Sequence, residues 1–70
     1  MNEIIFMIEE DLEGGFNAHA LGHSIFTEAE NIDELKKNII DALNCHFEKK
    51  SDIPKIIILH YVREEILNYA

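Results

Sequence analysis

Seventy residues are enough for one domain, and a chain of this length buries only about 60% of the surface that it exposes when unfolded. Fourteen Asp and Glu against six Lys and Arg give a formal net charge of -8, and residues 1–35 contain no Lys or Arg. Because contacts from Lys and Arg to phosphates supply most of the affinity of ordinary nucleic-acid binders, direct DNA or RNA binding is not expected.

The cysteine content and the apolar pattern predict a cytoplasmic protein. The single cysteine, Cys45, excludes an internal disulfide, which is the usual staple of small secreted domains, and favours a reducing compartment. The N-terminus lacks the charged start and apolar core of a signal peptide, and no apolar run approaches the roughly 18 residues of a membrane span. Secretion and membrane insertion are therefore not expected.

Three strands are predicted in the first thirty residues. The first covers residues 1–10 and is apolar on both faces, with the two-residue period of a strand. Gly14 and Gly15 tolerate the positive φ of a hairpin turn at residues 11–15. A second strand follows at residues 16–20, then a two-residue turn at Gly22 and His23, and then a third strand at residues 24–30.

One amphipathic helix is predicted at residues 32–48. Asn31 caps its start, and Glu34, three residues later, completes a capping box. Apolar residues then recur at helical spacing: Ile32, Leu35, Ile39, Leu43 and Phe47. After a loop that contains Pro54, residues 55–62 form a fourth strand that is also apolar on both faces. Residues 63–70 form either a short helix or an extension of this strand.

The predicted fold class is α+β, with the order β-β-β-α-β in one domain at residues 1–70. A right-handed crossover places strand four beside and parallel to strand one, so the mixed sheet has the order 3-2-1-4. One helix covers one face of this sheet, and the other apolar face needs a cover.

A homo-oligomer, dimer or tetramer, is the predicted cover. Its interface contains Ile5, Met7, Ile57, Leu59 and Tyr61, or else the apolar set on the opposite side of the sheet. The alternative is that residues 63–70, with Ile66 and Leu67, fold back over this face.

Six acidic residues are the candidate partner-binding residues: Glu9, Glu10, Asp11, Glu13, Glu28 and Glu30. They fit a basic protein partner, because complementary charge steers encounter and fixes orientation. The alternative is a solvated acidic surface that needs no partner. Catalysis of the RNase H type needs several carboxylates that converge on magnesium ions, whereas adjacent strand residues point to opposite faces. No catalytic residues are therefore predicted.

Four histidines and the cysteine are residue types that zinc prefers: His19, His23, Cys45, His46 and His60. Their spacing contains no repeated ligand pair, and Cys45 and His46 are neighbours on a helix, where consecutive side chains do not face each other. Neither a metal site, nor a Cys–His catalytic pair, nor a cofactor is therefore predicted. A small-ligand or metal-binding regulator that uses these histidines is the competing hypothesis.

The segment IFMIEEDLEGGFNAHA, Ile5 to Ala20, and the later FTEAENIDELKKNIIDAL together resemble the HicB-like antitoxin family. An apolar strand runs into acidic residues, a Gly-Gly-aromatic turn follows, and a Thr precedes a capped helix. The closing LHYVREEIL is similar to the end of short stand-alone members. The resemblance implies a partial RNase H-like fold and, in complete toxin–antitoxin pairs, the binding and masking of a small basic HicA-type toxin that cleaves RNA.

The chain departs from many members of that family in two places. Only Leu21 to Ser24 connect strands two and three, so contacts made by the longer connection of other members do not carry over. Residues 63–70 are too few for the appended helix-turn-helix or ribbon-helix-helix, so operator binding is not expected. An orphan HicB-like module without a toxin is a further alternative.

Overall fold

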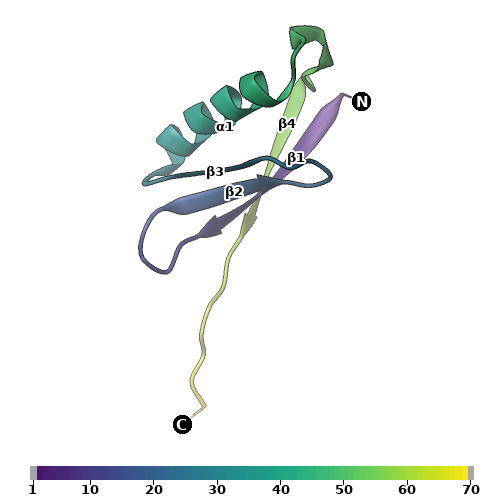
Figure 1. The fold of residues 1–70 in the computed structure, drawn as a ribbon. Helices are drawn as coiled ribbons and strands as arrows, with labels where there is room; N and C mark the ends of the chain where they lie inside the picture. Colours follow the sequence, from purple (N-terminus) through teal and green to yellow (C-terminus); the bar gives the residue numbers. More distant parts are fainter. Residues whose placement is uncertain (1, 70) are drawn as a thin grey trace.

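The computed structural model describes residues 2–69 as a four-stranded sheet with one helix on one face (Figure 1). The elements, in chain order, are β1 (Glu3–Glu10), β2 (Phe16–Ala20), β3 (Phe26–Ala29), α1 (Ile32–His46), the short 3-10 helix η1 (Lys50–Asp52) and β4 (Ile56–Val62). The sheet order is β3-β2-β1-β4, with β1 antiparallel to β2 and parallel to β4. The predicted α+β fold class, element order and strand order are confirmed.

Glycine supplies positive φ in both hairpin connections. Gly14 and Gly15 have φ of 104° and 84°, and the backbone N–H of Asp11 donates to the carbonyl of Gly15 at 2.9 Å, which closes the β1–β2 turn. Gly22 has φ of 80° in the β2–β3 turn. β3 begins at Phe26 rather than at the predicted residue 24, because Ile25 still belongs to this turn: its carbonyl accepts from the N–H of Ala20.

The start of α1 has the predicted cap. Asn31 has extended backbone, and its Oδ1 accepts from the backbone N–H of Glu34 at 2.8 Å. The hydrogen bonds found among residues 2–69 include no return bond from the Glu34 side chain, so the capping box is present in one half only. The helix ends at His46, two residues before the predicted end, because Phe47 has extended backbone and caps the helix.

Replacing Asn31 with Ala is expected to lower the free energy of unfolding by about 1 kcal/mol, because the N–H of Glu34 loses its side-chain acceptor. Urea denaturation measures the change. Asn44→Ala is the matched control, since Asn44 is exposed inside α1 and Ala is the better helix former there. Equal losses for the two variants would contradict a capping role for Asn31.

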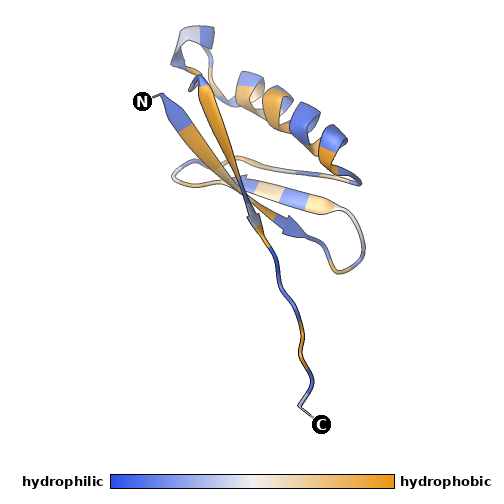
Figure 2. Ribbon diagram, turned by 180° about the vertical axis from the view of Figure 1, so that it is seen from behind, coloured by the Kyte–Doolittle hydropathy of each residue, from blue (hydrophilic) through white to orange (hydrophobic). Residues whose placement is uncertain are grey.

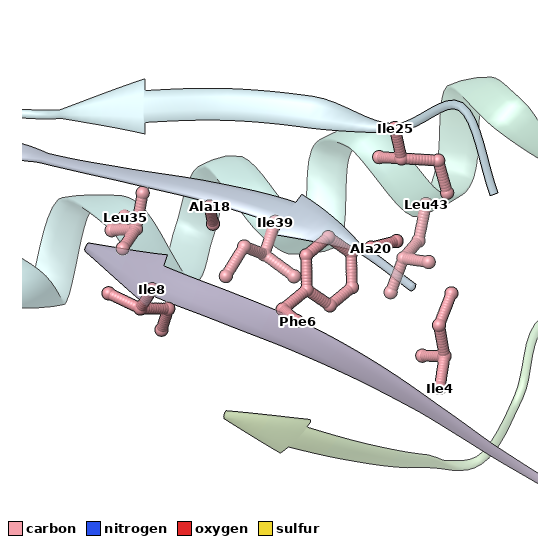
Figure 3. Packing of buried hydrophobic residues seen from close by; sticks show 9 residues of the cluster. All are labelled: Ile4, Phe6, Ile8, Ala18, Ala20, Ile25, Leu35, Ile39 and Leu43. Carbon is pink, nitrogen blue, oxygen red and sulfur yellow. The ribbon is translucent and has the colours of Figure 1, made fainter. Parts of the chain in front are cut away.

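The core lies between α1 and the sheet (Figure 3). Alternate residues of β1 are buried, and β2 contributes two alanines whose small side chains let the helix come close. The buried core cluster comprises Ile4, Phe6, Ile8, Ala18, Ala20, Ile25, Leu35, Ile39 and Leu43. α1 packs mainly on β3 and β2, so it shields the far edge strand β4 less well.

Residues 63–69, called the arm below, leave the end of β4 and extend away from the sheet (Figure 1). Every residue of the arm is exposed, and Ile66 and Leu67 are 90% and 96% exposed. The alternative that this segment folds back over the sheet is therefore wrong, and the arm is neither a helix nor a strand extension. No helix within residues 2–69 has the length and apolar character needed to cross a membrane.

Candidate protein-interaction surfaces

The face of the sheet away from α1, called the open face below, carries apolar side chains across three strands. The β1–β4 register pairs Ile5 with Ile58, and Met7 lies between His60 of β4 and His19 of β2. The apolar and histidine side chains of the open face are Ile5, Met7, His19, Phe26, Ile56, Ile58, His60 and Val62. Phe26 and Ile56 are 62% and 53% exposed, so this surface presents apolar area that is available to a partner.

The predicted interface set is divided between the two faces of the sheet. Ile5 and Met7 lie on the open face, whereas Ile57 and Leu59 pair with the buried Ile4 and Phe6 and pack against the core on the helix side. Tyr61 pairs with the buried Ile8, so it also belongs to the helix side. The prediction that these five residues share one face is wrong, because a register different by one residue exchanges the two faces of a strand.

The six predicted partner-binding acids gather at one end of the sheet, called the acidic end below. Glu9 and Glu28 flank Asn17 in one row of the open face. Glu10 ends β1, Glu30 follows β3, and Asp11 and Glu13 lie in the β1–β2 turn. The Oδ1 of Asp11 accepts from the backbone N–H of Glu13 at 3.0 Å, which orders this turn.

Two hollows flank the turn of the acidic end. The larger, of about 620 Å³, lies toward the arm and is lined by Glu9, Glu10, Asp11, Leu12, Val62, Arg63, Glu64 and Glu65. The smaller, of about 300 Å³, lies toward α1 and is lined by Asp11, Gly14, Gly15, Phe16, Glu28, Ala29, Glu30, Glu34 and Asn38. Five acidic residues line the larger hollow and four line the smaller, so the hollows suit the long cationic side chains of a partner.

The acids of the β1–β2 turn and those at the end of β3 are distant in the sequence. A close approach between the two backbones brings them together at the acidic end. A β-carbon on Gly15 would lie 2.8 Å from the carbonyl oxygen of Ala29, closer than real side chains come. The Nδ2 of Asn38 donates to the carbonyl of Glu28 at 3.0 Å, which ties α1 to β3 beside the same site. The glycine and this hydrogen bond therefore hold the β1–β2 turn, β3 and α1 together.

Two curated relatives place the chain in a family. A UPF0150 protein from Archaeoglobus fulgidus is 49% identical over 53 residues, which cover 76% of this chain and 77% of the relative. A UPF0150 protein from Thermotoga maritima is 34% identical over 62 residues, or 89% of this chain and 86% of the relative. The chain belongs to the UPF0150 family. No family model matches the chain. No solved structure matches it.

The histidines of this UPF0150 protein lie in two places. His19 and His60 lie on the open face on either side of Met7. His23 and His46 meet edge to face, with ring centroids 5.8 Å apart, and both rings also contact Phe47. Within residues 2–69, no three His, Cys, Asp or Glu side chains gather closely enough to hold a metal ion. The His23–His46 pair therefore packs as an aromatic cluster at the end of α1.

Sequence reasoning missed two parts of these UPF0150 surfaces. Glu64 and Glu65 line the larger hollow, and the sequence contained the signal: in parallel strands the carboxyl ends lie at the same edge, so residues after β4 must lie near residues after β1. Ile56 and Ile58 lie on the open face, and only the register of β4 against β1 reveals this placement.

Proposed function

We propose that this UPF0150 protein is a non-catalytic protein-interaction module of the HicB antitoxin type, which binds and neutralises a small basic HicA-like toxin that cleaves RNA. The observation that carries the proposal is the gathering of six acidic side chains at one end of the sheet. We place the protein in the cytoplasm, where such a toxin would meet its RNA.

The acidic end supports this function by competing with RNA for the basic surface of the toxin. A protein that cleaves RNA must contact phosphates through Lys and Arg, so a rigid array of carboxylates offers those side chains an alternative partner. The hollows on both sides of Asp11 can accept the long side chains, which would then form charge-assisted hydrogen bonds with the lining carboxylates. RNA and the antitoxin would therefore exclude each other from the toxin.

The arrangement of the acids supports a binding role rather than catalysis. Glu9 lies on the open face, and the adjacent Glu10 points to the helix side, so the carboxylates spread along an edge instead of converging on a common ion.

We further propose that the open face mediates homo-oligomer formation, because apolar area there is worth about 25 cal/mol per Å² when it is removed from water. Direct nucleic-acid binding is not part of the proposal, since the acidic end repels phosphates.

A binding experiment with a charge-matched control tests the acidic end. The tagged protein is purified from its own cells, a copurifying small basic protein is identified, and its RNA cleavage and its affinity are measured with the purified pair. Changing Glu10, Glu13 and Glu28 to Lys is expected to weaken binding by roughly tenfold or more and to relieve the inhibition of RNA cleavage. All three residues are exposed, so the fold should tolerate the changes.

The control changes Asp41, Glu48 and Asp52 to Lys. These residues are also exposed, but they lie in the second half of α1 and beyond it, and the change in net charge is the same. The control variant should keep nearly the affinity of the unchanged protein. Equal weakening by both variants would mean that net charge alone acts, and a partner that the protein does not inhibit would contradict the antitoxin role.

A further inference from the structure

We propose that the arm of one copy pairs with the free edge of β4 in a second copy, and that the two copies exchange arms in a two-fold dimer. This contact uses the arm and the free edge of β4, and Arg63, Glu64 and Glu65 of the arm also line the larger hollow of the acidic end. The arm carries three exposed apolar residues, Ile66, Leu67 and Tyr69, which are 90%, 96% and 103% exposed. Figure 2 shows a short hydrophobic segment within an otherwise hydrophilic arm, standing clear of the sheet.

The acceptor is the edge of β4 together with a groove beside it. β4 is the last strand of the sheet, and its outer side pairs with no other strand of residues 2–69. Between β4 and α1 runs a groove of about 220 Å³, lined by Lys36, Ile39, Ile40, Ile57 and Leu59. This volume lies below the roughly 300–1,000 Å³ of typical small-molecule sites, so it suits a side chain from a peptide strand.

The arm cannot easily reach its own groove. It continues from the end of β4, whereas Ile57 and Leu59 lie in the first half of that strand. To return along its own strand, the chain would have to reverse at once, and residues 55–69 contain neither Gly nor Pro to form a tight turn. The extended arm of a second copy meets no such obstacle.

Two-fold symmetry, apolar matching and charge together favour one antiparallel register. An axis through the two Val62 residues places Ile66 opposite Ile58 and Leu67 opposite Ile57 in the other copy. Opposed side chains point to the same face, so Ile66 joins the open face and Leu67 enters the groove. An axis at residue 63 would oppose the two Arg63 side chains, and an axis at residue 61 would place Leu67 opposite Lys55 rather than in the groove.

Charge complementarity supports the same register. It places Glu65 opposite Leu59, which lines the groove together with Lys36, so the carboxylate can meet the ammonium group. It also places Glu64 opposite His60 on the open face. The acidic pair that precedes Ile66 and Leu67 therefore faces basic side chains of the second copy.

Sedimentation of the purified full chain over a concentration series tests the exchange. Leu67→Ser is expected to weaken the dimer by roughly tenfold or more, because two buried leucines are lost per dimer. Leu21→Ser is the matched control, since Leu21 is 48% exposed in the β2–β3 turn and lines neither the groove nor the hollow beside the arm. A monomeric unchanged protein, or a dimer that Leu67→Ser leaves intact, would overturn the proposal.

Two further variants make the test specific for the register. Lys36→Glu and Glu65→Lys should each weaken the dimer, and the double variant should restore it. In a Cys45→Ser background, Val62→Cys should form a disulfide-linked dimer on oxidation, whereas Ser24→Cys, exposed in the β2–β3 turn, should not. A Val62→Cys protein that stays uncrosslinked would overturn the register.

These measurements also distinguish the arm exchange from the proposed open-face contact and from the binding of a basic partner at the acidic end. If Phe26→Ser disrupts association and Leu67→Ser does not, the open face holds the copies together and the arm exchange is wrong. Binding of the proposed basic partner is read from the Glu10, Glu13 and Glu28 variants, which leave every residue of the arm unchanged.

Discussion

Replacing Ile39 with Ala is expected to lower the free energy of unfolding by about 3 kcal/mol. Ile39 is 1% exposed in the middle of α1, where it packs among the core residues of β1 and β2 (Figure 3). Truncation removes buried methyl groups and leaves a cavity that the short sheet cannot easily fill. Stabilities of about 0.05–0.15 kcal/mol per residue put the whole domain at roughly 4–10 kcal/mol, so this loss is a large share.

The neighbouring residue supplies the control for this prediction. Ile40→Ala changes the same residue type on the same helix, but Ile40 is 48% exposed and leaves little cavity, so the expected loss is below about 1 kcal/mol. Urea denaturation of both variants, at concentrations low enough to dissociate any dimer, measures the difference. Equal losses at the two positions would contradict the orientation of α1 on the sheet.

The order of the elements could be predicted because each signal is local. Alternating apolar residues mark the strands, and Asn31 marks the start of the helix, whose side chain makes the expected hydrogen bond. The expected crossover through α1 then places β4 beside β1, as the strand order confirms. These rules need no knowledge of side-chain packing, which explains why the strand order was correct.

The pairing of β1 with β4 could not be predicted residue by residue. A tight hairpin fixes the register of antiparallel neighbours, whereas β1 and β4 are connected through β2, β3, α1 and η1 and have no such local constraint. Both strands are apolar on both faces, so the pattern does not say which side of β4 meets the helix. For this reason Ile57 and Leu59 were assigned to the same face as Ile5, and the structure puts them on the other.

The position of α1 also lay beyond the sequence. An amphipathic helix shows which of its sides is buried, but not which strands it covers. The small Ala18 and Ala20 draw α1 toward β2 and β3, and this displacement opens the groove beside β4. The groove that receives the arm therefore depends on packing, which the sequence does not show. The acids of the acidic end lie in or beside the turns, so their gathering could be predicted from the sequence.

Gly15→Ala is expected to destabilise the protein by about 3 kcal/mol in total. A β-carbon at a positive φ costs about 1–2 kcal/mol, and Gly15 has φ of 84°. The new carbon would also lie 2.8 Å from the carbonyl oxygen of Ala29 and 3.5 Å from the Cα of Glu30. Since both neighbours are backbone atoms, relief requires a shift of β3, which adds about 1–3 kcal/mol.

Gly22→Ala separates the two causes. Gly22 has nearly the same φ, 80°, but a β-carbon there meets nothing within 4 Å, so only the backbone strain remains and the expected loss is about 1 kcal/mol. Urea denaturation compares the two variants, and equal losses would show that the close approach of Gly15 to β3 adds nothing. The same approach holds Asp11 and Glu13 near Glu28 and Glu30. If the acidic end binds the proposed basic partner, Gly15→Ala should also weaken that binding, whereas Gly22→Ala should not.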